Sequence, residues 1–141
     1  MISGLKPTVR KSRSRKRLLI VDDCPVARAK LSDQLSDNFQ VELANSGENA
    51  IEILETPDQH DQSAANEFDL IITDLIMPGI DGMELVKYIK EKNQANRLTP
   101  IILISGELEK LNRVKKNGCV AYLSKDDTQK LLPMVKFLIH Q

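Results

Sequence analysis

Five residues with side chains suited to chemistry stand at or just past the ends of apolar runs. Asp22 and Asp23 follow LLIV, Asp74 follows LIIT, Ser105 follows PIILI, and Lys125 lies just past VAYL. If these runs are parallel strands, their carboxyl ends meet at one edge of a sheet, where such sheets bind ligands. That edge would gather three carboxylates, one hydroxyl and one ammonium group.

This set of groups indicates phosphoryl chemistry. Three crowded carboxylates repel one another and have raised pKa values unless a cation joins them. Oxygen ligands without His or Cys favour Mg²⁺, with Mn²⁺ as the alternative ion, and Mg²⁺ is typically held by one or two carboxylates together with phosphate oxygens. A carboxylate beside the ion can attack a phosphoryl group and become an aspartyl phosphate. The ammonium and the hydroxyl would share the charge of the transferred oxygens.

The elements that must position these residues alternate along the chain. Strands are predicted over 18–21, 41–44, 69–73, 100–104 and 120–123. Helices are predicted from Pro25, after Ser46, from Gly82, from Glu107 to a cap at Gly118, and from about Gln129 unless the last one kinks at Pro133. The strand runs are apolar throughout rather than alternating, so we expect an α/β protein with a parallel sheet covered on both faces. Residues 58–67 are polar and read as a surface loop.

Four motifs in order, LLIVDD, DLIMPGIDGMEL, PIILISG and AYLSK, carry a family resemblance. In them the chain resembles the receiver domain of two-component response regulators, of the chemotaxis-receiver type, over residues 17–141. The resemblance implies a three-layer flavodoxin-like (βα)5 sandwich, doubly wound, with five parallel strands in the order 2-1-3-4-5. It implies a phosphoacceptor signalling domain rather than an enzyme. The phosphoryl donor would be a phosphohistidine of a histidine kinase or a histidine phosphotransfer protein.

The resemblance also assigns roles to individual residues. A switch would alter the surface made by the fourth helix, fifth strand and fifth helix, which would bind a downstream protein or a second copy in a homodimer. The roles are phosphoacceptor for Asp74, Mg²⁺ ligands for Asp22, Asp23, Asp74 and the backbone carbonyl of Ile76, phosphoryl contacts for Ser105 and Lys125, and switch residues for Ser105 and Tyr122.

One position departs from the family pattern, and two others occupy places where the family tunes its chemistry. Asp126 occupies the place after the lysine where the family usually has proline, often with a cis peptide bond. Ile76 and Glu107, each two residues beyond a site residue, are where this family tunes the access of water to the aspartyl phosphate. An apolar side chain at 76 cannot orient that water, so we expect slow self-dephosphorylation.

Two other classes of protein share part of this pattern. Phosphohydrolases and phosphomutases with an aspartyl nucleophile typically carry a second carboxylate two residues after it, and Ile76 argues against that class. A degenerate receiver that only binds partners is disfavoured by the full set of acidic, Ser and Lys residues. The chain is either a stand-alone receiver or a fragment of a larger regulator with a separate output domain.

Composition adds a charge asymmetry. Residues 1–17 hold seven Lys or Arg and no acid, so residues 18–141 hold 13 basic and 20 acidic residues, a net formal charge of −7. Residues 1–16 are predicted to be a disordered basic leader or linker, and contact with nucleic acid is not favoured because no aromatic or second basic patch accompanies them.

Location and redox state follow from what the sequence lacks. No apolar stretch is long enough for a membrane span, and the start lacks the apolar centre of a secretory signal, so a cytoplasmic protein is expected. Cys24 and Cys119 form no metal or disulfide pattern and are predicted to be reduced, mostly buried thiols.

Overall fold

The fold is a five-stranded parallel sheet in the order β2-β1-β3-β4-β5, with helices on both faces. The computed structural model describes residues 15–58, 66–107 and 121–139. The strands are β1 (Arg17–Val21), β2 (Gln40–Ala44), β3 (Leu70–Asp74), β4 (Ile101–Ser105) and β5 (Ala121–Ser124). The helices are α1 (Pro25–Leu35), α2 (Gly47–Glu55), α3 (Gly82–Lys92), α5 (Leu131–Ile139) and the 3₁₀ segments η2 (Gln94–Asn96) and η3 (Lys125–Lys130). The predicted fold class and strand order are confirmed.

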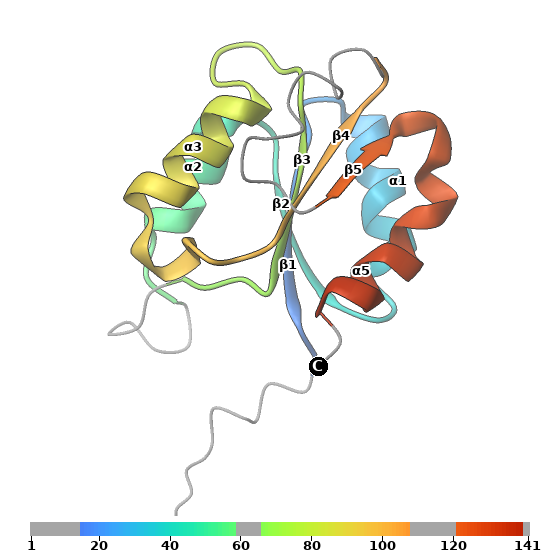
Figure 1. Cartoon of the computed structure of the whole chain (residues 1–141), viewed down its shortest axis with the longest axis horizontal. Coiled ribbons are helices and arrows are strands. Elements are labelled where there is room, and N and C mark those ends of the chain that lie inside the picture. The colour runs from blue at the N-terminus through green and yellow to red at the C-terminus, as the bar shows by residue number, and fades with distance from the viewer. Residues whose placement is uncertain (1–14, 59–65, 108–120, 140–141) are drawn as a thin grey trace, which may run out of the picture.

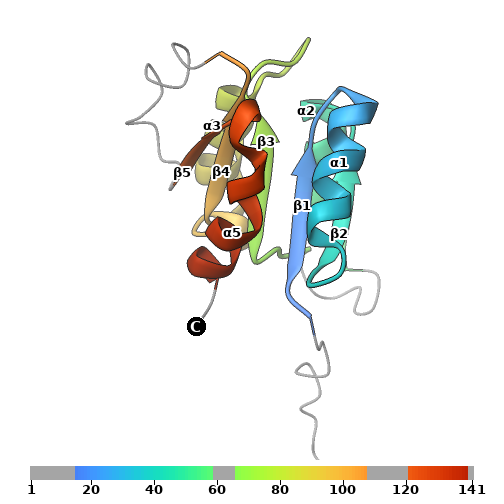
Figure 2. The ribbon, with the colours of Figure 1, turned by 90° about the vertical axis from the view of Figure 1, so that its right-hand side faces the viewer.

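Two hydrophobic cores lie on opposite faces of the sheet. Figures 1 and 2 show α2 and α3 against one face and α1 and α5 against the other. Successive side chains of a strand point to opposite faces, so Leu19 of β1 joins the core under α2 and α3 whereas Ile20 joins the core under α1 and α5. This division explains why the strand sequences are apolar without alternation.

Burial follows each strand's place in the sheet. Every residue of the central strands β3 and β4 is buried, because both faces are covered and both edges are paired. The edge strand β2 is only partly buried, and Leu43 on it is exposed. These two fully buried strands are the ones that end in Asp74 and Ser105, so the candidate site is built on the most deeply buried part of the sheet.

Local sequence signals set the helix starts. Pro25 occupies the first turn of α1, where the missing N–H is harmless. The hydroxyl of Ser46 accepts a hydrogen bond from the Asn49 N–H and caps α2. Asp81 and Glu84 form a reciprocal capping box at the start of α3. These caps fix where each loop at the carboxyl edge of the sheet ends.

The ends of the predicted elements differ slightly from the observed ones. Each strand boundary falls within one residue of its prediction, and β3 and β4 include Asp74 and Ser105 as their last residues. Helix α5 begins at Leu131 after the 3₁₀ segment, which places Pro133 in its first turn. The late start is therefore the correct alternative to a kink. The helix predicted from Glu107 to Gly118 lies almost entirely outside the described residues.

The prediction of a buried thiol is wrong for Cys24. Its side chain is exposed and free, because the residue occupies the turn between β1 and α1 as the helix N-cap residue. Cys119 lies outside the described residues.

Most of the basic leader lies outside the described residues, and the membrane prediction can be compared only with the described helices. Residues 1–14 lie outside the described ranges, so the prediction for the basic leader stays a prediction. Among the helices of residues 15–58, 66–107 and 121–139, none is long and apolar enough to cross a membrane.

Candidate functional site

Parallel register brings the predicted site residues to one edge of the sheet. Asp74 ends β3 and pairs with the penultimate residue of β4, so Ser105 lies one position further along the edge. Ser105 pairs with Ser124 of β5, and Lys125 follows directly. Asp22 comes immediately after β1, which is the neighbour of β3 on the other side.

Asp22, Asp23 and Asp74 form a carboxylate cluster. One oxygen from each lies within 4.8 Å of the others. Asp22 and Asp74 are buried while Asp23 is exposed. Within the described part of the chain, Asp22 Oδ2 is the only buried side-chain oxygen or nitrogen without a hydrogen bond. Three hard oxygen donors, one of them buried and not hydrogen-bonded, fit a divalent cation such as Mg²⁺.

Lys125 places a positive charge against this cluster. Its Nζ lies 3.2 Å from Asp74 Oδ2, to which it donates a hydrogen bond, and 3.5 Å from Asp22 Oδ2. Burial lowers the pKa of the Lys125 ammonium, but the carboxylates of Asp22 and Asp74 outweigh burial and hold that pKa above its ordinary value. The lysine is therefore a fixed cation at neutral pH and part of the site.

Asp74 carries an unfavourable charge. Burial, followed by the neighbouring charge of Asp22, raises the pKa of the Asp74 carboxyl, and the ion pair with Lys125 compensates only in part. The Ile76 N–H donates a long hydrogen bond of 3.4 Å to Asp74 Oδ1. A second cation would relieve this residual repulsion.

Asp22 is held by the backbone around it. Its Oδ1 accepts a hydrogen bond of 2.9 Å from the Cys24 N–H. Its carbonyl oxygen accepts one of 2.6 Å from the Arg28 guanidinium on α1. The Asp22 carboxylate is thus oriented through its Oδ1 atom, and its Oδ2 atom faces Lys125.

The β3–α3 loop, residues 75–81, leaves the sheet directly after Asp74. Its start is tied to the sheet, since the Leu75 N–H donates to the Ile104 carbonyl at 2.8 Å. The Gly82 N–H donates to the Leu75 carbonyl at 2.8 Å and closes the loop. A side chain on Gly82 would meet the carbonyl oxygen of Asp74 at 2.5 Å. Ile76 in this loop has an exposed side chain beside the carboxylate cluster.

Ser105 and Tyr122 are placed as predicted, but their roles are not tested by their contacts. Ser105 is buried, and its hydroxyl oxygen accepts a hydrogen bond from the Glu107 N–H at 3.0 Å. Tyr122 is half-buried and packs against the core under α2 and α3. The helix predicted after Glu107, which would be the partner of both residues in a switch, lies outside the described residues.

The segment after Lys125 replaces the usual proline turn with a short helix. Ser124 Oγ accepts a hydrogen bond from the Asp126 N–H at 3.1 Å and caps η3. The described residues contain no cis peptide bond. A capped 3₁₀ turn therefore holds Lys125 in place without proline at 126.

Two residues at this edge were not found from the sequence. Arg28 holds the Asp22 backbone, and Glu48 on α2 accepts a hydrogen bond of 3.2 Å from the Ile80 N–H in the β3–α3 loop. The Glu48 contact spans 32 residues, and the Arg28 contact spans six residues across the turn between β1 and α1, so neither follows from the spacing within one element.

A parallel α/β sheet with a carboxylate cluster and a lysine at its carboxyl edge defines a class of phosphoryl- and cation-binding proteins. The sequence model of the response regulator receiver domain family matches residues 18–136. The chain belongs to the response regulator receiver domain family, related to the response regulators of two-component systems.

Individual relatives agree with this assignment. The probable transcriptional regulator ycf29 of Porphyra purpurea is 29% identical, over 88% of this chain and 56% of that protein. The chain thus spans about half the length of this relative. The chemotaxis protein CheY4 of Vibrio cholerae is similar in structure, with a TM-score of 0.71 and 30% identity, covering 89% of this chain and 99% of that one.

A second similar structure contains ligands. The receiver domain of the histidine kinase CKI1 from Arabidopsis thaliana, complexed with Mg²⁺ and BeF₃⁻, has a TM-score of 0.72 and 26% identity and covers 89% of this chain and 91% of that one.

Proposed function

We propose that Asp74 accepts a phosphoryl group from a phosphohistidine of a histidine kinase or a histidine phosphotransfer protein, in a Mg²⁺-dependent reaction. The observation that carries the proposal is the Asp74 carboxylate, clustered with Asp22 and Asp23 and hydrogen-bonded to Lys125 at 3.2 Å. In the transfer, an oxygen of Asp74 attacks phosphorus and the P–N bond to the donor imidazole breaks. The electron pair of that bond returns to the imidazole nitrogen, and an aspartyl phosphate forms.

The cluster supplies the metal ligands in this proposal. Asp22, Asp23, Asp74 and the backbone carbonyl of Ile76 would hold Mg²⁺, or Mn²⁺ as the alternative ion. When bound, the ion neutralises charge on the phosphoryl oxygens. The Asp22 Oδ2 atom, buried without a hydrogen bond, supports this assignment. The Mg²⁺ and BeF₃⁻ in the CKI1 receiver domain support cation and small-anion binding for this chain as well.

Lys125 and Ser105 would contact the transferred group. Lys125 already lies against Asp74 Oδ2, so its ammonium can pair with a phosphoryl oxygen after small movements. The Ser105 oxygen accepts from the Glu107 N–H, which leaves its O–H free to donate to the phosphoryl group. Movement of Ser105 with repacking of Tyr122 would change the surface of the fourth helix, β5 and α5.

The signalling role follows from this switch. The chain would act in the cytoplasm as a phosphoacceptor rather than as an enzyme with a separate substrate. Its output would be a protein contact through the altered surface, with a downstream target or with a second copy.

The test is a mass measurement. The protein is incubated with acetyl phosphate and Mg²⁺, and intact mass spectrometry is expected to show the gain of one phosphoryl group. Asp74→Asn and excess EDTA should each abolish the gain. No gain in the unmodified protein would indicate a degenerate receiver that only binds partners, and a gain that survives Asp74→Asn would place the acceptor elsewhere.

A further inference from the structure

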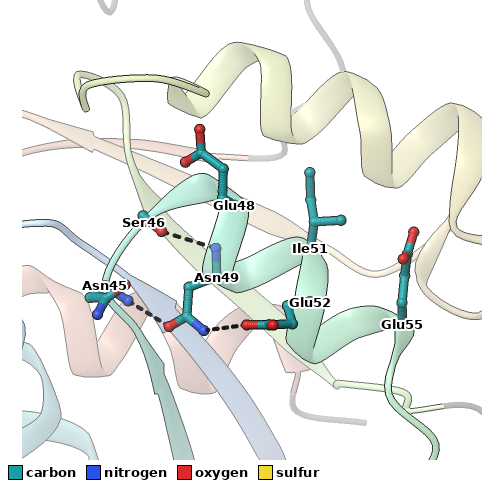
Figure 3. Close-up of a pocket in the computed structure, with 7 residues that line it drawn as sticks. All are labelled: Asn45, Ser46, Glu48, Asn49, Ile51, Glu52 and Glu55. Atoms are coloured by element: carbon teal, nitrogen blue, oxygen red, sulfur yellow. Dashed lines mark hydrogen bonds between the residues drawn. The ribbon is translucent and has the colours of Figure 1, made fainter.

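The β3–α3 loop is held from outside the carboxylate cluster by α2. The Glu48 carboxylate, in the first turn of α2, accepts a hydrogen bond of 3.2 Å from the Ile80 N–H. An acidic side chain is favoured there by the helix N-terminus, and its negative charge strengthens the bond to the amide. In Figure 3, Glu48 projects from α2 toward α3 and the loop, whereas Glu52 projects to a different side, next to Asn49.

Two glycines show that the loop and α2 fit closely. Gly79 has φ of 73°, a conformation that favours glycine, and a Cβ added there would collide with the Glu48 carboxylate. A Cβ added to Gly47 would lie 2.6 Å from the Ile80 carbonyl oxygen. The first turn of α2 therefore touches the loop at Gly79 and Ile80 through both backbone and side chain.

The contact acts on the stretch that contains the proposed carbonyl ligand. The loop start is fixed by the hydrogen bonds of Leu75, and its end is fixed by the Asp81 cap of α3. Between them, Ile80 is tied to Glu48, and Pro78 restricts the backbone on the way back to Ile76. Fixing Ile80 thus narrows the range of positions that the Ile76 peptide can take.

We propose that Glu48 is a positioning residue for the metal site, which holds the β3–α3 loop so that the Ile76 carbonyl is preset for a cation. The inference rests on the proposed function, since it takes the Ile76 carbonyl as a ligand. Without Glu48, the loop must become ordered when the metal binds. The affinity for Mg²⁺ then falls by the free energy that this ordering costs.

The experiment compares Glu48→Ala with Glu48→Gln and with Glu52→Ala by calorimetric titration of Mg²⁺. Glu48→Ala is expected to weaken Mg²⁺ binding about fivefold, the effect of losing one ordinary hydrogen bond. Glu48→Gln should restore most of the affinity, because its amide oxygen can accept the same N–H. Glu52→Ala removes the same charge from the same helix without a contact to the loop, and should bind Mg²⁺ like the unmodified protein.

Three further readouts separate positioning from a merely structural role. Without Mg²⁺, Glu48→Ala should melt about 4 °C below Glu52→Ala, because only Glu48→Ala loses the hydrogen bond to the loop and the acid at the helix N-terminus. That loss leaves the protein folded at the titration temperature, so weaker Mg²⁺ binding cannot come from unfolding. With saturating Mg²⁺, the rate of phosphorylation by acetyl phosphate should return to that of the unmodified protein, because the bound ion then orders the loop. Gly79→Ala should be less destabilising in the Glu48→Ala background, where the collision is absent, than in the unmodified protein.

The outcomes distinguish this inference from the proposed function. Unmodified protein that binds Mg²⁺ and becomes phosphorylated, together with equal Mg²⁺ affinity in Glu48→Ala, would overturn the positioning role and leave the proposed function intact. Equal weakening of Mg²⁺ binding in Glu48→Ala and Glu52→Ala would show that the effect comes from charge alone. That result would also overturn the positioning role of Glu48. Unmodified protein that binds no Mg²⁺ would overturn both.

Discussion

Asp74 carries its negative charge in a buried position next to a second buried carboxylate. Its pKa is raised by burial and by Asp22, so folding favours the protonated form. The stability that this group contributes is present below the ordinary Asp pKa and is lost as the pH rises through the higher pKa of the folded state. At neutral pH, without divalent cations, the ionised carboxylate is therefore a cost to the fold.

Replacing Asp74 with Asn should accordingly stabilise the metal-free protein. We expect Asp74→Asn to raise the melting temperature at pH 7 in EDTA by about 2 °C or more. The difference should shrink as the pH is lowered toward the ordinary pKa of Asp, because the Asp74 carboxyl of the folded protein then takes up a proton and loses its charge. Asp33→Asn, which removes the same charge from an exposed position on α1, should leave the melting temperature unchanged. A lower melting temperature for Asp74→Asn would mean that the Lys125 ion pair outweighs the repulsion.

The side chain of Ile76 is the basis of a second prediction about a single residue. Its exposed apolar side chain lies two residues after the phosphoacceptor and cannot orient a water for attack on the aspartyl phosphate. We expect the phosphorylated protein to decay over minutes or longer with Mg²⁺ present. Ile76→Asn should shorten the lifetime by about tenfold, since a side-chain amide can position water. Mass spectrometry measures the loss of the phosphoryl group over time. Its loss from the unmodified protein within seconds would contradict the slow-hydrolysis prediction.

At the scale of elements, the strands and the edge they form could be predicted from the sequence. The apolar runs ending in Asp22, Asp74 and Ser105 identified the carboxyl edge, because two-sided burial leaves a strong pattern and parallel strands end together. The holding contact of Glu48 could not be found, since it joins a helix and a loop 32 residues apart. The contact of Arg28 with Asp22 is closer in the chain, but it depends on how α1 packs back against the end of β1. The burial of the Cys24 side chain was predicted wrongly for a related reason. Its exposure depends on how the β1–α1 turn meets solvent, which residue type does not determine.

The start of α3 offers a test of an element that closes the site loop. Asp81 and Glu84 accept each other's backbone N–H at 2.9 Å and 3.0 Å. Asp81→Ala removes the Asp side-chain acceptor and should lower the free energy of unfolding by about 1 kcal/mol. Urea denaturation measures this change, and Asp81→Asn, which keeps a capping oxygen, should lose much less. Equal losses in the two variants would assign the effect to charge rather than to the cap.

At the scale of the whole molecule, a cation at the cluster should be coupled to global stability. Asp22, Asp23 and Asp74 come from the ends of two neighbouring strands, so the ion would bind the folded chain and have no preformed site in the unfolded one. Such a ligand stabilises by about 2.7 kcal/mol at one hundred times its dissociation constant, which is about 5–10 °C in melting temperature for a domain of this size.

Mg²⁺ titration of the melting temperature tests this coupling, and EDTA should reverse it. Asp22→Asn is expected to lose most of the increase, although Asn can keep the Oδ1 hydrogen bond from the Cys24 N–H. Because residues 18–141 carry a net formal charge of −7, general screening of repulsion is the competing explanation for any effect of salt. NaCl at matched ionic strength should therefore give a much smaller rise than Mg²⁺. An equal rise with NaCl, or a full Mg²⁺ response in Asp22→Asn, would show that stability responds to bulk charge and not to an ion held by the carboxylate cluster.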